Sequence, residues 1–325
     1  AVSFLFSRLF ISKTVLPKDT AAVMFIPAAA SYDTVVDTLN RYLLIKNKAA
    51  FNWLAKKKRY PELIKPGRYV VRKAISINEL IDMLRSGNQA PVRVTFNNIR
   101  SMEQLAGRFA KQLETDSAGF VSFFADEANY SHDGFTKENI ISIFIPDTYE
   151  FYWNTDAKGI YARMLKEYNR FWTPERVAKA EAEGLSRSDV SILASIIDDE
   201  VLKKEEKPRI AGVYLNRLRQ GIPLQACPTI KFAMNDFTIT RVLDRYLKIE
   251  SPYNTYKYKG LPPGPVGCAT IDGIDATLNA EKHDYLFFSA KADFSGYHNF
   301  ARTLAQHNRY AAEYHRELDR RRIFR

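Results

Sequence analysis

The sequence predicts an α+β protein, in which a small module of strands and helices precedes a mainly helical domain with a few strands. Short apolar strands followed by serine-capped helices recur in residues 21–112, and apolar residues at helical spacing dominate residues 186–325. The chain has 325 residues, enough for two or three domains. We therefore expect four parts: a leading segment (1–20), an α+β module (21–112), a linking α/β segment (113–185) and the helical domain (186–325).

Three strand–turn–helix units make up the first module. The serine that opens the helix is followed three residues later by Glu79 in the second unit and by Gln104 in the third. This spacing is typical of a capping box, in which each side chain accepts a backbone N–H from the other residue. Three unequal copies favour a compact α+β module over a solenoid. The expected strands are Ala22–Ile26, Arg68–Val71 and Val92–Phe96; the helices begin at Ser31, Ser76 and Ser101, and Gly87 ends the second helix.

The later elements follow from cap and turn signals. Ser186 with Asp189 forms another capping box, and Pro208 and Pro228 suit the first turns of two further helices. We expect an aromatic strand or turn at 145–152, helices at 157–172, 174–183 and from 186, 208 and 228, a rigid loop at 253–264, a strand at 284–289, a turn at 293–296 and a basic helix ending near 322.

Composition and charge limit the kinds of partner and binding site that we expect. The net charge of +11 favours anionic partners. Nucleic acid is not expected, because the chain has neither zinc-finger spacing nor an RNA-binding aromatic motif. The five histidines show no metal-ligand spacing, so we expect no metal site, and no cofactor. The 21 Phe and 18 Tyr suit a large core and a groove that stacks on flat ligands such as sugars.

The first eleven residues are apolar, but Arg8 interrupts them. Crossing a bilayer takes about 20 apolar residues, so this stretch is too short to span a membrane. We expect residues 1–20 to be a juxtamembrane segment that follows an N-terminal anchor missing from this chain. An ordinary first strand is the alternative.

Three consecutive carboxylates, Asp198, Asp199 and Glu200, end the first helix of the C-terminal domain. At about 100° per residue, the apolar residues of this helix form one stripe, and only Glu200 of the three points inward with it. Burial raises the pKa of a carboxyl group, which can then donate a proton near neutral pH. We therefore predict that Glu200 is a general acid. A helix-end glutamate that reaches solvent or pairs with Arg209 or Arg217 is the structural alternative.

Six motifs stand in order between residues 194 and 308: ASIIDDE (194–200), VYLNRL (213–218), LQACPT (224–229), YNTY (253–256), GLPPGP (260–265), and HNF (298–300) leading to HN (307–308). Together they resemble the endolytic murein transglycosylase family (YceG-like, MltG-type). IPDTY (145–149) matches an upstream family segment, and weaker similarity extends back to about residue 22.

This resemblance implies a LysM-like N-terminal module, a lysozyme-like catalytic domain and Glu200 as the acid/base residue. It implies cleavage of the β-1,4 bond between MurNAc and GlcNAc in peptidoglycan strands, with the 6-hydroxyl of the same muramic acid attacking to give a 1,6-anhydro end. The implied partners are peptidoglycan and cell-wall synthases. The implied location is the bacterial inner (cytoplasmic) membrane, single-pass, with the catalytic part on the periplasmic or extracytoplasmic side.

Further residues of these motifs are expected to bind substrate. Asn216 and Gln225 would hydrogen-bond sugar hydroxyl or N-acetyl groups, the YNTY motif would line a glycan groove with its tyrosine faces stacking on sugars, and the last motif would position the loop. Structural roles, in helix contacts and in holding the loop, stay open as alternatives. The residues are Asn216, Gln225, Tyr253, Asn254, Tyr256, His298 and Asn299.

The chain departs from the family pattern at two positions. Asp198 stands where the family usually has Glu, and Cys227 stands where it usually has Asp. The second change bears on activity if that Asp orients substrate, and costs only about 1 kcal/mol of stability if it caps the helix at Pro228. Two rival functions stay open: a peptidoglycan-binding scaffold with weak or no catalysis, and a hydrolase with Asp147 or Asp199 as its second carboxylate.

The two cysteines are Cys227 and Cys268. Both are expected in loop segments that flank the groove, in a compartment that permits oxidation. We predict that they lie close together and form a disulfide, which requires Cα atoms within about 7 Å.

Overall fold

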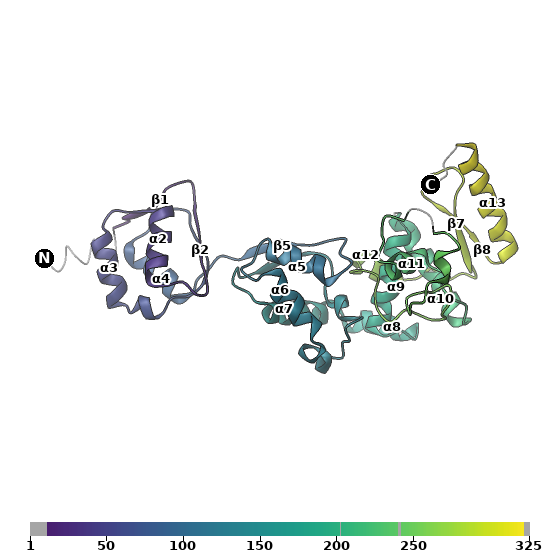
Figure 1. The fold of residues 1–325 in the computed structure, drawn as a ribbon, viewed down its shortest axis with the longest axis horizontal. Helices are drawn as coiled ribbons and strands as arrows, with labels where there is room; N and C mark the ends of the chain where they lie inside the picture. Colours follow the sequence, from purple (N-terminus) through teal and green to yellow (C-terminus); the bar gives the residue numbers. More distant parts are fainter. Residues whose placement is uncertain (1–11, 202, 240–241, 322–325) are drawn as a thin grey trace. The chain divides into compact units, whose positions relative to one another are not determined.

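The computed structural model describes residues 12–201, 203–239 and 242–321, and it confirms the α+β fold class (Figure 1). These residues divide into two compact units. The first comprises the described residues up to 95 together with 106–123 and 148–161; the second comprises 96–105, 124–147 and the described residues from 162 onward. The four-part division and the LysM-like character stay predictions. Within the described ranges, no helix is both long and apolar enough to cross a membrane.

Antiparallel strand pairs and helices form the N-terminal part of the first unit. Side chains alternate along β2 (Ala22–Ile26) and β4 (Gly67–Val71), so that Met24 and Tyr69, paired across the ladder, are both fully buried. Met24 and Tyr69 belong to a buried apolar cluster, and side chains from the surrounding helices pack into it. The other elements here are β1 (Val15–Pro17), its partner β3 (Leu43–Ile45), α2 (Tyr32–Tyr42), α3 (Lys48–Lys57) and α4 (Ile77–Ser86).

The predicted capping box of α4 is present. The Ser76 hydroxyl accepts the backbone N–H of Glu79, and the Glu79 carboxylate accepts the backbone N–H of Ser76 at 2.6 Å. Gly87 ends the helix at a φ of 74°, a left-handed conformation that glycine adopts without steric cost. The box at Ser101 is only half formed, because the Gln104 side chain accepts the backbone N–H of Arg100 instead.

The third predicted strand-and-helix unit forms, but its strand does not pair with the strands of the first two units. Its strand, β5 (Val92–Thr95), pairs with β6 (Thr148–Phe151), which comes from the aromatic segment predicted as a strand or turn. An apolar pattern determines which face of a strand is buried, but it does not determine the partner strand. The helices that follow are α5 (Met102–Ala110), α6 (Ser117–Ala125) and α7 (Ala157–Phe171).

Helix α9 (Arg187–Glu200) is the central element of the second unit, and every residue from Val190 to Ile197 is buried. A helix that packs against neighbours on several sides is apolar around most of its circumference. The single apolar stripe predicted from the sequence is therefore incomplete. The neighbours of α9 include α8 (Pro174–Ala182), α10 (Lys207–Arg219), α11 (Cys227–Ala233) and α12 (Ile271–Leu278).

An antiparallel hairpin of β7 (Phe287–Ala290) and β8 (His298–Ala301) carries the last helix, α13 (Leu304–Arg320), along its length (Figure 1). Phe288 and Phe300 of this hairpin pack against the α9 cluster. The sequence analysis placed the first strand of this hairpin at 284–289, slightly before β7, and it predicted neither β8 nor α12. The short 3₁₀ segments are η2 (Tyr60–Glu62), η3 (Glu127–Asn129), η4 (Ser131–Asp133), η5 (Ile140–Ile143), η6 (Lys204–Glu206) and η7 (Tyr246–Lys248).

Candidate active site

The three carboxylates on the last turn of α9 lie in three different environments. The helix begins with the predicted capping box, in which Ser186 and Asp189 each accept the other's backbone N–H. It ends at Glu200, and the backbone of Val201 is extended. A defined start and a buried middle thus fix the rotation of the helix, and with it the direction of each carboxylate.

Asp198 is not directed at solvent, contrary to the prediction that only Glu200 of the three points inward. Its side chain is 12% exposed and forms an ion pair with Nζ of Lys207 at 2.6 Å. It also accepts hydrogen bonds from the backbone N–H of Thr270 at 2.7 Å and from the Thr270 hydroxyl at 2.8 Å. The helical wheel placed Asp198 off the main stripe, but α12 covers that side of α9. Asp198 therefore ties α9 to α10 and to the start of α12.

Asp199 is exposed, as its position off the apolar stripe predicts. Its carboxylate forms an ion pair with Arg100 at 2.7 Å. The same guanidinium lies 4.4 Å from the centre of the Phe237 ring, a cation–π distance. Asp199 therefore takes part in a surface contact with the segment 96–105.

Glu200 is half-buried, and its carboxyl meets two hydrogen-bond donors. The Tyr214 hydroxyl donates to Oε1 at 3.0 Å, and the backbone N–H of Cys227 donates to the same carboxyl group. Burial raises the pKa of Glu200 to about 7, although both hydrogen bonds and the nearby Lys231 act to lower it. A carboxyl group with this pKa is present in both protonation states at neutral pH, and can therefore give a proton and take one back.

The ion pair that the structural alternative offers for Glu200, with Arg209 or Arg217, does not form. Arg209 pairs with Glu281 at 2.9 Å. Arg217 is buried and donates to the carbonyl of Leu224 at 2.7 Å. Neither guanidinium therefore neutralises the Glu200 carboxylate directly.

Cys227 lies beside Glu200, but the predicted disulfide is wrong, because both cysteines are free. Cys227 begins helix α11 instead of lying in a loop, and its Sγ is 3.3 Å from the Tyr256 hydroxyl. Cys268 is buried elsewhere, with its backbone N–H bonded to the carbonyl of Ile99. Burial and the nearby Glu200 carboxylate raise the pKa of the Cys227 thiol, which is therefore neutral at pH 7.

Two of the amides predicted to bind substrate make structural contacts. Asn216 and the fully buried Asn254 each donate two hydrogen bonds from the side-chain amide to backbone carbonyls. These bonds hold the segment that follows α12 and the segment at η7, and the substrate-binding roles of both residues stay predictions. The acceptors are His283 and Tyr285 for Asn216, and Leu247 and Ile249 for Asn254.

Gln225, Tyr256 and Tyr253 lie on the α11 side of the second unit. Gln225 has a left-handed φ of 52° and accepts a hydrogen bond from Arg217 at 2.8 Å. Tyr256 is brought into the surroundings of Glu200 through its contact with Cys227. Tyr253 packs on the Phe232 ring, with 4.6 Å between the ring centres, so its contacts here are with the core.

His298 and Asn299 lie on β8. Glu206, 6% exposed, accepts from the backbone N–H of His298 at 3.0 Å and contacts its Nδ1 at 2.9 Å. Asn299 pairs with Ser289 across the hairpin. The ring of Phe288 packs against both His298 and Tyr214.

Sequence reasoning missed Tyr214 and Glu206. A signal for Tyr214 was present, because a buried tyrosine on an apolar helix face needs a partner for its hydroxyl. Glu206 follows three charged residues and carries no comparable signal in the sequence.

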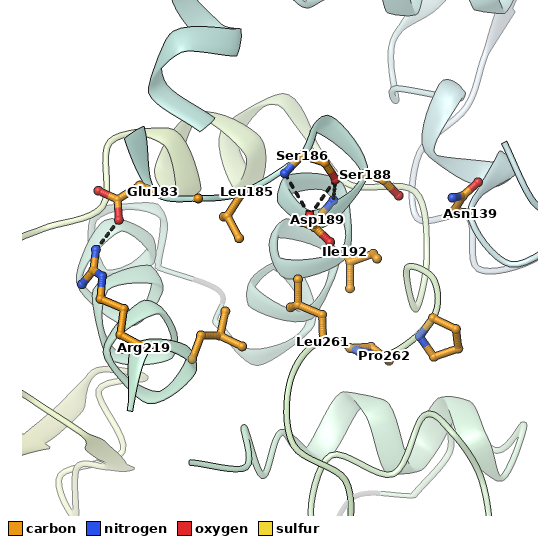
Figure 2. Close-up of a pocket in the computed structure, with 13 residues that line it drawn as sticks. Asn139, Glu183, Leu185, Ser186, Ser188, Asp189, Ile192, Arg219, Leu261 and Pro262 are labelled. Atoms are coloured by element: carbon orange, nitrogen blue, oxygen red, sulfur yellow. Dashed lines mark hydrogen bonds and ion pairs between the residues drawn. The ribbon is translucent and has the colours of Figure 1, made fainter. Parts of the chain in front are cut away.

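A hollow of about 730 Å³ opens at the N-terminal end of α9 (Figure 2). Ile192, on its wall, and Glu200 are about 12 Å apart along the helix axis at 1.5 Å per residue, so the hollow is separate from the surroundings of Glu200. Its charged side chains already have partners, as Figure 2 shows for Glu183 with Arg219 and for Asp189 in the capping box. A smaller hollow of about 270 Å³ lies on the Asp198 side of the helix.

Comparison with known proteins gives matches over nearly the whole chain. A model of the YceG-like family matches residues 24–313. A Bacillus subtilis protein named endolytic murein transglycosylase is 27% identical over 328 residues, covering 96% of this chain and 90% of the relative. A Streptococcus pneumoniae protein of the same name, from strain D39, is 26% identical over 345 residues, and the match spans 95% of this chain but only 62% of the longer relative.

A solved structure agrees with the family match. The 2.6 Å crystal structure of a yceG-like protein from Listeria monocytogenes has a TM-score of 0.58 and 25% identity, covering 89% of this chain and 98% of that one. Because the family match extends over far more than half of the sequence and a solved member shares the fold, this chain belongs to the YceG-like family.

Proposed function

We propose that this chain is an endolytic lytic transglycosylase that cleaves the β-1,4 bond between MurNAc and GlcNAc in peptidoglycan and leaves 1,6-anhydro-MurNAc ends. The names of the curated relatives support the substrate class. The mechanism rests on one observation, the half-buried Glu200 carboxyl whose pKa burial raises to about 7.

In the first step, protonated Glu200 donates its proton to the glycosidic oxygen while the bond from that oxygen to C1 of MurNAc breaks. In the second step, the 6-hydroxyl of the same MurNAc attacks C1 and passes its proton to the Glu200 carboxylate. Glu200 returns to its starting state and no water is consumed. Because nucleophile and reacting carbon belong to one sugar, proximity replaces the second carboxylate that would position a water.

The test is digestion of purified peptidoglycan by Glu200→Gln. Glutamine has nearly the same volume and still accepts a hydrogen bond from Tyr214, but it neither gives nor takes the required proton. We expect a loss of about 10²–10⁴-fold in anhydro-ended products scored by mass, with glycan binding intact. Asp199→Asn is the control and should keep its activity, because this exposed residue pairs with Arg100; it is also one of the two carboxylates, with Asp147, that the rival hydrolase mechanism could use.

Several results would contradict the proposal. Full activity in Glu200→Gln would exclude Glu200 as the acid, and reducing ends in place of anhydro ends would support the hydrolase. A wild-type protein that binds glycan without cleaving it would support the scaffold alternative.

We also propose, from the substrate class, that the chain acts on the extracytoplasmic side of the cytoplasmic membrane, anchored at its N-terminal side and working with cell-wall synthases. Accessibility of the chain to protease added outside spheroplasts tests the location. Protection of the chain until the membrane is broken would contradict it.

A further inference from the structure

Tyr214 reaches Glu200 from α10, a different helix from the one that carries the carboxyl. Its hydroxyl donates to Oε1 at 3.0 Å, and its side chain is 1% exposed. The ring belongs to the same apolar cluster as Ile197 of α9, and it stands perpendicular to the ring of Phe288 with 5.8 Å between their centres. This packing prevents the ring of Tyr214 from turning its hydroxyl toward water.

We propose that Tyr214 is a positioning residue for the reaction, which holds the Glu200 carboxyl in one orientation through Oε1 and sets how readily that group releases its proton. This inference rests on the proposed catalytic role of Glu200. Tyr214 itself transfers no proton and forms no bond to the substrate.

The chemistry follows from opposing effects on one carboxyl group. Burial favours the neutral acid, whereas a hydrogen bond donated to the carboxylate favours the charged form. Without the Tyr214 hydroxyl, only the backbone N–H of Cys227 would oppose burial as a direct donor. Burial and the adjacent Glu200 keep the pKa of Tyr214 well above 10, so its hydroxyl remains a donor throughout the range in which Glu200 titrates.

Four other groups face Glu200, and they come from α9, from α11 and from the segment 253–256. Lys231 of α11 lowers the pKa of Glu200 and Asp199 of α9 raises it. The thiol of Cys227 and the hydroxyl of Tyr256 lie close enough for Glu200 to raise the pKa of both. A change confined to the Tyr214 hydroxyl leaves all four groups in place, which makes its effect on Glu200 separable.

Tyr214→Phe is the decisive variant, because it removes the hydroxyl and keeps the ring in its packing. We expect the titration midpoint of Glu200 to rise by about one pH unit, since a hydrogen bond to a charged group is lost. The midpoint is followed by the ¹³C shift of the Glu200 side-chain carboxyl, assigned by its absence in Glu200→Gln. The alkaline limb of the pH profile for peptidoglycan cleavage should move up by the same amount, with kcat lowered and KM unchanged.

A second variant should shift the titration midpoint of Glu200 in the opposite direction. Incorporating 3-fluorotyrosine at position 214 keeps the ring and makes the hydroxyl a stronger donor, so the midpoint of Glu200 should fall. Tyr168→Phe is the matched control, because Tyr168 is a buried tyrosine of the same unit that packs on Trp172. It should move neither the carboxyl titration nor the pH profile.

An unmoved Glu200 midpoint in folded Tyr214→Phe would overturn the positioning role even if activity fell, and so would an equal shift in Tyr168→Phe. Failure of the proposed function gives a different result. In that case Glu200→Gln would still cleave peptidoglycan, whatever happens to the carboxyl titration in Tyr214→Phe.

Discussion

Replacing Glu200 by Gln should change the pH dependence of stability in a way that follows from the burial of this carboxyl. The pKa of Glu200 is about 7 in the folded chain, against 4.5 for an ordinary glutamate. Below pH 4.5 both the folded and the unfolded chain hold the proton, and burial has no electrostatic cost. As the pH rises, the unfolded chain ionises first, so the wild type loses stability until the folded carboxyl has ionised as well.

The size of this loss follows from the two pKa values. A pKa difference of about 2.5 at 1.36 kcal/mol per pKa unit corresponds to about 3 kcal/mol, lost between about pH 4.5 and pH 7. Glutamine does not titrate. Relative to the wild type, Glu200→Gln should therefore gain about 3 kcal/mol of unfolding free energy between pH 4 and pH 8, on top of any constant difference from altered hydrogen bonds.

Urea unfolding of both proteins at pH 4, 6 and 8 measures this change. Glu181→Gln, at an exposed position on α8, is the matched control and should give no pH-dependent difference. The reasoning is refuted if the free-energy difference between Glu200→Gln and wild type is the same at pH 4 and pH 8, or if Glu181→Gln shows the same trend.

Three further predictions concern neighbouring groups. Lys207→Met should cost about 3–5 kcal/mol in urea unfolding, because it leaves the Asp198 carboxylate buried without its cation; a cost below 1 kcal/mol would mean that the pair is effectively solvated. Cys227→Asp places a second carboxylate beside Glu200, which raises the pKa of Glu200 and should move the alkaline limb of cleavage to higher pH; a downward shift would contradict this. Thiol titration of unfolded, unreduced protein should find both Cys227 and Cys268 free, and a result of no free thiols would restore the disulfide.

Signals contained within one helical turn predicted the structure well. The capping boxes at Ser76 and Ser186 form as expected, and the prolines Pro208 and Pro228 stand in the first turns of α10 and α11. A capping box works because its donors and acceptors are neighbours in sequence, and a first-turn proline works because its fixed φ suits the helix and its missing N–H is not needed there, so neither signal needs tertiary information. The pairing of β5 with β6 was not predicted, because it joins segments distant in the chain.

The same distinction holds at the site. Helical periodicity was enough to place Glu200 toward the interior, because the neighbouring apolar residues of α9 determine that face. Periodicity could not show that Asp198 is enclosed as well, since its partners Lys207 and Thr270 come from other elements. The role of the Asn254 side chain was equally undetermined, because its acceptors are the backbone carbonyls of Leu247 in η7 and of Ile249 after it.

Cys227 shows how a substitution in a motif is resolved by its surroundings. Residue 227 is the first residue of α11, after Ala226 at the cap position, so a side chain here does not cap the helix. Its backbone N–H bonds to Glu200, and that bond does not depend on which side chain residue 227 carries. Its neutral thiol meets the Tyr256 hydroxyl instead of adding a second negative charge near Glu200. Cysteine in place of aspartate therefore changes the electrostatic environment of Glu200 while leaving the donors that orient Glu200 in place.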